Sequence, residues 1–162
     1  MQVRPATIDD AEAIRSIYNP EVLEATVTFD LVPRTLEEQR AWLSDRSGVH
    51  AAVVAVDEGG AVVGFASLSP YKERPAYRTT VEDSVYVHRD NQGGGIGTLL
   101  LGELLATARL HGFHAVVARI VGGHDASISL HARHGFATVG TEREVGRKFG
   151  RWLDVVVMQR LL

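Results

Sequence analysis

Residues 79–112 read TTVEDSVYVHRDNQGGGIGTLLLGELLATARLHG, and this stretch decides the fold. The run over 79–87 is rich in β-branched residues, which predicts a strand, and four glycines follow it. From residue 98 onward, apolar residues fit one helix face, and a glycine stands past their end (Leu99, Leu100, Leu104, Leu105, Ala108; Gly112). A strand, a glycine-rich loop and a helix in this order predict a crossover unit of an α/β sheet.

The segments on either side supply partners for that strand. Residues 113–121 (FHAVVARIV) are apolar enough to be buried on both faces, which predicts a central strand parallel to 79–87. Upstream, 50–56 and 61–69 are apolar runs joined by DEGG, and they predict an antiparallel hairpin. The loop 71–78 (YKERPAYR) between these units is polar and interrupted by proline.

The two ends of the chain are expected to close the fold. Near the N-terminus, Thr7 is the predicted cap of one helix, and Thr35 with Glu38 forms a capping box for a second; both helices are expected to be short. Near the C-terminus, Asp125 is the predicted cap of a short helix with Ile128 and Leu130 inward and a stop at Gly135; strands over 137–145 and 152–161 follow.

These elements predict a single domain over residues 1–162. Its fold class is α/β: a mixed, mostly antiparallel sheet with one parallel strand pair and helices on both faces. A chain of 162 residues matches the size of one typical domain, and the sequence shows no internal repeat or long polar linker.

Composition excludes several classes of function. The chain has no cysteine, which excludes disulfide scaffolds, zinc–thiolate sites, iron–sulfur clusters and cysteine nucleophiles. A net charge of −3 disfavours nucleic acid and anionic membranes as partners. No run approaches the ~18 apolar residues of a membrane span, and acidic residues stand where a signal peptide would be apolar, so we expect a cytoplasmic protein.

The glycine loop predicts an anion site. Gly93, Gly94, Gly95 and Gly97 lie before a helix N-terminus, where unpaired N–H groups and the helix dipole favour phosphate; a tight turn is the alternative reading. The loop has no lysine, so it is not a Walker loop. The spacing of its glycines and the absence of an acidic residue in 113–121 give little support to a dinucleotide site.

The loop instead matches Q-x-x-G-x-G, and here the sequence resembles the GCN5-related N-acetyltransferases, whose element order also agrees with that of nearly the whole chain. The resemblance implies that the strand pairs with the pantetheine arm of acetyl-coenzyme A and that the loop wraps its pyrophosphate. The implied coenzyme-binding residues are Val85, Tyr86, Val87, Gln92, Gly93, Gly94, Gly95, Ile96, Gly97, Thr98, His124 and Ser127.

A narrower resemblance runs from end to end. The stretches TVTF (26–29), YKERPAY (71–77), VEDSVYV (81–87), LHARHGF (130–136) and FGRWLD (149–154) are similar to the phosphinothricin and methionine sulfoximine acetyltransferase subfamily. This resemblance implies acetyl transfer to the α-amine of a small amino-acid analogue, by a homodimer.

Acetyl transfer to an amine needs a base for the ammonium proton and an acid for the departing thiolate. The resemblance implies that Glu82 is the base, with Asp83 as the rival. Strand alternation places Glu82 on the face opposite Val87. His131 is the candidate acid, in place of the tyrosine of many family members, and a packed helix histidine is the alternative. His124 stands where the wider family has asparagine.

The acceptor residues are implied by the subfamily motif. Lys72, Arg74 and Tyr77 lie in the basic loop and suit an α-carboxylate, although such a loop can also be an ordinary solvated surface. Phe29 is a candidate aromatic wall, and so is Trp152, unless either belongs to the core. No metal is expected, because the histidines lack ligand spacing and a nearby carboxylate.

Two other functions stay open. One is an acetyltransferase of the same fold that acts on another small amine or on a protein N-terminus. Polycationic acceptors are disfavoured, because the loop YKERPAYR is basic. The other is a non-catalytic domain that only binds coenzyme A.

Overall fold

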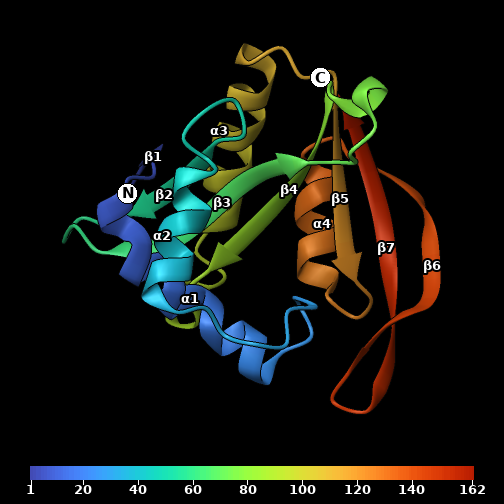
Figure 1. The fold of residues 1–162 in the computed structure, drawn as a ribbon, viewed down its shortest axis with the longest axis horizontal. Coiled ribbons are helices and arrows are strands. Elements are labelled where there is room, and N and C mark those ends of the chain that lie inside the picture. The colour runs from blue at the N-terminus through green and yellow to red at the C-terminus, as the bar shows by residue number, and fades with distance from the viewer.

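The computed structural model describes residues 1–162, and its seven strands form one sheet in the order β1-β2-β3-β4-β5-β7-β6 (Figure 1). Only β4 and β5 are parallel; every other neighbouring pair is antiparallel, as the sequence predicts. The strands are β1 (Gln2–Pro5), β2 (Ala52–Val56), β3 (Val62–Pro70), β4 (Thr80–Val87), β5 (Ala115–Val121), β6 (Ala137–Lys148) and β7 (Arg151–Leu161).

Four helices cover the two faces of this sheet (Figure 1). One face carries α1 (Ala11–Glu24) and α2 (Leu36–Ser44), which bury Phe65. The other face carries α3 (Ile96–Leu110) and α4 (Asp125–Arg133). Each face of the sheet buries one cluster of apolar side chains beneath its helices. Full burial of a Leu or Phe side chain contributes roughly 1.5–3 kcal/mol, so these two clusters hold the helices against both faces. No helix has the length and apolarity needed to cross a lipid bilayer.

Several local signals are confirmed in atomic detail. The Glu38 N–H donates to Thr35 Oγ1 over 3.1 Å, and the Thr35 N–H donates to Glu38 Oε2 over 2.8 Å, which is the predicted capping box. Gly112 and Gly135 end α3 and α4 with φ of +82° and +81°, a region that favours glycine.

Other expectations about the helices were wrong. The first helix is not short: it has 14 residues and continues through Pro20, and Thr7 caps a preceding 3-10 turn rather than α1 itself. On α3, Leu99 is 48% exposed and Leu101 is buried, because two residues along a helix turn the side chain by about 200°, to nearly the opposite side. His124, not Asp125, is the cap residue of α4.

The parallel pair is short, and this positions the site. Three residue pairs join β4 to β5: Thr80 with Ala115, Val81 with Val116 and Glu82 with Val117. Beyond Glu82 the strands diverge (Figure 1), and residues 83–87 pair with β3 alone. A backbone edge in the middle of the sheet is thus left without a strand partner.

Candidate active site

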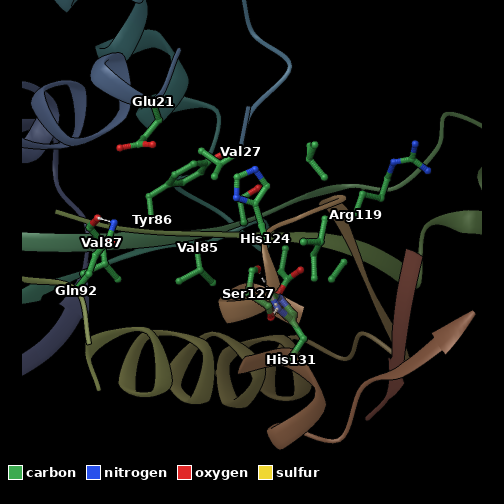
Figure 2. Close-up of a pocket in the computed structure, with 15 residues that line it drawn as sticks. Glu21, Val27, Val85, Tyr86, Val87, Gln92, Arg119, His124, Ser127 and His131 are labelled. Carbon is green, nitrogen blue, oxygen red and sulfur yellow. Dashed lines mark hydrogen bonds and ion pairs between the residues drawn. The ribbon is translucent and has the colours of Figure 1, made fainter. Parts of the chain in front are cut away.

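Two adjoining hollows follow the divergence of β4 and β5. A cavity of about 160 Å³ lies between the strands, and a groove of about 700 Å³ reaches the glycine loop. Figure 2 shows Glu21, Val27 and Tyr86 on one side of β4 and Ser127 and His131 on the other. The residues common to both hollows are Val27, Val85, Val87, Gln92, His124 and Ser127.

The main chain of β4 provides polar groups along this split. The His88 N–H donates to the Val63 carbonyl over 2.9 Å, and antiparallel alternation therefore turns the N–H and C=O groups of Val85 and Val87 toward β5. Because β5 has diverged, these groups have no strand partner there. An extended ligand with amide groups can complete the ladder, which fits the pantetheine arm predicted from the sequence.

The glycine loop has the geometry of an anion cradle. Gly93 and Gly95 have φ of +81° and +80°, and open space lies where each Cβ would stand. Gly95 caps α3 without a side-chain hydrogen bond, and the first intrahelical bond runs from the Leu99 N–H to its carbonyl. The amide groups of residues 96–98 therefore have no helix partner and fit the phosphates of a coenzyme.

The four glycines have different roles, although the sequence suggested a shared one. A Cβ on Gly97 would stand 3.2 Å from Leu130 Cδ2, so Gly97 allows close packing of α3 on α4. Gly94 has an ordinary φ and ample space, so neither constraint requires glycine there. Ile96 is buried in the core and can offer only its backbone, whereas Thr98 lines the groove. Arg133, which the sequence did not single out, adds a cation to the groove wall.

Other predicted coenzyme residues occupy distinct positions. Tyr86 turns its ring to the α1 face, where the ring centroid lies 5.2 Å from that of Phe65. Its side chain therefore packs with the apolar cluster beneath α1 and α2, although it also lines the cavity. His124 bonds Thr26 Oγ1 through Nε2 over 2.9 Å and thereby ties α4 to the segment after α1. Burial lowers the pKa of His124, which favours its neutral form.

His131 forms a buried ion pair with Asp83 at the cavity wall. Its Nε2 lies 2.9 Å from Asp83 Oδ2, and its Nδ1 lies 2.7 Å from the Ser127 carbonyl oxygen. A carboxylate and a carbonyl oxygen both accept hydrogen bonds, so this arrangement favours the doubly protonated ring. Burial alone would lower the pKa of His131, but Asp83 and the carbonyl outweigh it, and the net shift is upward. Asp83 Oδ1 is buried beside the cavity without a partner.

Glu82 stands at the apex of the split, on the opposite face. It occupies the last paired position of β4 with β5, and alternation points its side chain away from Asp83 and His131. Burial raises the pKa of the Glu82 carboxyl, Arg119 opposes this rise, and Asp83 adds to it. Arg119, another residue that the sequence did not single out, also pairs with Glu142 over 2.6 Å. A half-buried carboxyl with a raised pKa is suited to accept a proton.

The predicted acceptor loop is not brought to these hollows in the single chain. Lys72, Arg74 and Tyr77 are exposed and line neither the cavity nor the groove. Tyr71 and Tyr77 pack edge to face at 5.5 Å, with the Lys72 ammonium over both rings. No three His, Asp or Glu side chains gather in a geometry that could hold a metal ion.

The aromatic candidates lie on the β6–β7 hairpin side. The ring of Phe29 packs against Gly146, where a Cβ would overlap the ring atoms. Trp152 is 61% exposed beneath Arg147, so it belongs neither to the core nor to the cavity wall. Lys148 is buried, and its ammonium donates to the Thr28 carbonyl over 2.9 Å. This hydrogen bond links the β6–β7 hairpin to the segment after α1.

Comparison with known proteins agrees with this geometry. Residues 3–157 match the family described as Acetyltransferase (GNAT) domain. The chain belongs to the GNAT acetyltransferase family. It is 44% identical to a phosphinothricin N-acetyltransferase of Streptomyces coelicolor, over 100% of this chain and 96% of the relative. It is 41% identical to an L-methionine sulfoximine/L-methionine sulfone acetyltransferase of Pseudomonas aeruginosa, over 97% and 92%.

Solved structures of acetyltransferases share the fold closely. A phosphinothricin acetyltransferase of Sinorhizobium meliloti in complex with AcCoA has a TM-score of 0.96 and 40% identity, over 99% of this chain and 88% of that one. A structure from Brucella melitensis named ribosomal-protein-alanine N-acetyltransferase has a TM-score of 0.97 and 40% identity, over 100% of both chains. The names of these two acetyltransferases thus point to two kinds of acceptor.

The cradle geometry predicts the effect of a side chain at Gly95. Gly95→Val forces a β-branched residue into a left-handed conformation at the helix N-terminus and fills the space above the free amides. We expect the dissociation constant of acetyl-coenzyme A to rise at least tenfold, about 1.4 kcal/mol, in calorimetry. Gly48→Ala, at an open position with ordinary φ, is the control; unchanged affinity in Gly95→Val would contradict the cradle.

The buried pair predicts a loss of stability in His131→Asn. The side chains of His131 and Asp83 are 4% and 1% exposed, so removal of the imidazolium leaves an uncompensated buried carboxylate. We expect the free energy of unfolding in urea to fall by about 3–5 kcal/mol. The double variant His131→Asn/Asp83→Asn should recover much of this loss; a single variant within about 1 kcal/mol of wild type would refute the pair's role.

The same pair predicts a pH dependence. The pKa of folded His131 lies above its ordinary value of 6.5, so the pair's stabilisation is complete below pH 6.5 and is lost as pH rises through the folded value. Urea titrations from pH 6 upward should show this loss in the wild type and not in the double variant. A parallel slope in both proteins would assign the dependence to other groups.

Proposed function

We propose that this GNAT enzyme transfers the acetyl group of acetyl-coenzyme A to the α-amine of a small amino-acid analogue of the phosphinothricin, methionine sulfoximine or methionine sulfone type. The observation that carries the proposal is the split between β4 and β5, with main-chain groups along it that lack a strand partner, an anion cradle at one end and Glu82 at its apex. The names of the relatives at 41–44% identity support the acceptor class.

In this proposal the chain binds the donor mainly through its backbone. Val85 and Val87 complete hydrogen bonds with the pantetheine arm, and the amides of residues 96–98 receive the pyrophosphate. Arg133 adds a positive charge at the groove wall. The thioester then lies in the small cavity between the strands.

Glu82 is the proposed base on the acceptor side. It takes a proton from the acceptor's ammonium group, directly or through a water molecule, so that the free amine can attack the thioester carbonyl carbon. A carbon–nitrogen bond forms, the carbon–sulfur bond then breaks, and the thiolate leaves. The raised pKa of Glu82 brings its basicity closer to that of the amine at neutral pH.

His131 is the proposed acid on the coenzyme side. The departing thiolate needs a proton, and the imidazolium at the cavity wall carries two. Transfer of the Nε2 proton leaves a neutral ring that still bonds the Ser127 carbonyl. Asp83, whose Oδ1 has no partner beside the cavity, is the group through which that proton can pass.

Arg74, with Lys72 and Tyr77, is the proposed ligand of the acceptor's α-carboxylate, on the basis of its charge and of the subfamily motif. Phe29 is proposed to border the acceptor from the segment after α1. We further propose a cytoplasmic enzyme that acts as a homodimer, for which sedimentation analysis is the direct test.

A substrate panel separates the two acceptor classes. Release of free thiol from acetyl-coenzyme A should be fast with L-phosphinothricin, methionine sulfoximine or methionine sulfone. A peptide with N-terminal alanine represents the second candidate function, which the name of the Brucella melitensis structure favours. If only the peptide is acetylated, the small-acceptor proposal is wrong. If acetyl-coenzyme A binds but no acceptor causes release of thiol, the chain is a domain that only binds the coenzyme.

The role of Glu82 predicts a slow Glu82→Gln variant. The amide keeps the shape and loses basicity, so kcat should fall ~10²–10⁴-fold with little change in coenzyme binding. The acidic limb of the wild-type pH profile should lie above the ordinary Glu pKa of 4.5 and disappear in the variant. A fall in kcat of less than threefold would transfer the role to Asp83 or solvent.

The acceptor loop predicts a selective loss in Arg74→Ala. Removal of one charge-assisted bond of about 1.5–3 kcal/mol should lower kcat/KM for methionine sulfoximine roughly 10–150-fold, with the coenzyme KM unchanged. Arg78→Ala, at another exposed position in the same loop, is the matched control. Esterified acceptors cannot use the guanidinium; if the wild type prefers them, carboxylate recognition is wrong.

A further inference from the structure

A second polar cavity adjoins the split on the α1 face of the sheet. It has a volume of about 110 Å³ and lies between the helices α1 and α2 and the strands β3 and β4. Ser84 and Tyr86 line both this cavity and the one between β4 and β5, so the two are neighbours across β4. Its walls consist of two arginines, three serines and four aromatic residues (Arg34, Arg46; Ser67, Ser69, Ser84; Tyr18, Trp42, Phe65, Tyr86).

The cavity carries positive charge that the protein compensates only in part. The Arg34 guanidinium carbon lies 4.0 Å from the ring centroid of Tyr18 and 5.2 Å from that of Trp42, and that of Arg46 lies 4.1 Å from Trp42. Two positively charged guanidinium groups thus lie over the same ring, that of Trp42. Asp30 reaches Arg34 over 3.8 Å, but no carboxylate lies within 4.0 Å of Arg46. Burial, followed by the charge of Arg34, lowers the pKa of Arg46.

The hydrogen-bond donors of the pair are also incompletely used. Arg46 donates to Ser69 Oγ over 2.8 Å and to the Trp42 carbonyl over 3.2 Å, while its buried Nε has no partner. Arg34 donates to Gln39 Oε1 over 3.2 Å. Asn19 holds the Arg34 backbone at both its N–H and its carbonyl, so this side chain starts from a fixed position. A half-buried guanidinium with a free, buried donor favours an anionic oxygen as its partner.

We infer that this cavity, which we name the Arg34–Arg46 pocket, binds the side-chain phosphinate of an acceptor whose amine lies at the split. This inference rests on the proposed function and refines its acceptor class. A tetrahedral oxyanion presents oxygens in several directions and can meet two guanidinium groups and the serine hydroxyls together. The neutral oxygens of a sulfone gain less from the same charges. The pocket therefore selects for negative charge at the acceptor's far end.

The first test compares two acceptors in matched variants. Arg46→Met keeps the length of the side chain over Trp42 and removes the charge. We expect the KM for L-phosphinothricin to rise at least tenfold, the KM for L-methionine sulfone to change less than threefold, and the coenzyme KM to stay constant. Arg34→Met should act in the same direction. Arg40→Met, at an exposed position of α2, is the control and should change none of these values.

Arg46→Lys separates charge from packing. It should restore part of the affinity for L-phosphinothricin, because an ammonium keeps the charge without the fork of donors. An equal rise in KM for both acceptors, or no rise for L-phosphinothricin, would overturn the inference, because the arginines would then not discriminate between acceptors by their charge.

A second test needs no variant. Dimethylphosphinate, a bare phosphinate without an amine, should compete with L-phosphinothricin and not with acetyl-coenzyme A in the wild-type enzyme. It should also raise the melting temperature of the wild type and of Arg40→Met, but not of Arg46→Met. Absence of competition and of the thermal shift would refute the pocket. If the wild type acetylates neither small acceptor, the proposed function fails instead, and the thermal shift alone still decides whether the phosphinate binds.

Discussion

The early end of the β4–β5 pairing is the constraint on which the rest of the site depends. Three residue pairs hold these strands together, and after Glu82 the sheet opens in its middle rather than at its edge. Backbone groups at such an opening lack the partners that a continuous sheet would supply, and in a protein interior they need a polar ligand. The opening thus makes a binding site out of main-chain atoms, which the identity of a side chain alone would not reveal.

The opening also separates two electrostatic environments. On the α4 face, His131 and Asp83 form a pair whose net charge is near zero, close beneath the cavity. On the other face, Glu82 lies near Arg119, which is itself paired with Glu142. Alternation along one strand is enough to keep the two acidic side chains at positions 82 and 83 in different surroundings. In the proposed mechanism, a proton is accepted on one face of the strand and donated on the other.

The sequence predicted those parts of the fold whose signals are local. The hairpin 50–69, the Thr35–Glu38 capping box and the glycine loop each depend on residues close together in the chain, and each is present. The parallel strand pair is also present, because its two strands follow one another along the chain with only the glycine loop and α3 between them. Helix details were less accurate, because tertiary packing, not spacing alone, decides that Leu101 rather than Leu99 is buried.

The residues that were missed are those placed by long-range contacts. Arg133 and Val27 reach the groove from elements whose relative position no local pattern encodes. Arg34 and Arg46 meet only because Trp42 and the strands beneath them bring two surface-like sequence positions over one cavity. Conversely, the motif around Arg74 was visible in the sequence, but in the single chain its side chains stay outside the hollows.

The buried ammonium of Lys148 has a consequence for how the molecule assembles. Its bond to the Thr28 carbonyl joins positions 120 residues apart, whereas the strand, loop and helix of residues 79–112 need only neighbours in the chain. Contacts of such long sequence separation form against a large loop-closure entropy and tend to form late in folding. The coenzyme side of the split can therefore form early in folding, whereas the β6–β7 hairpin docks only after the N-terminal and C-terminal parts of the chain have come together.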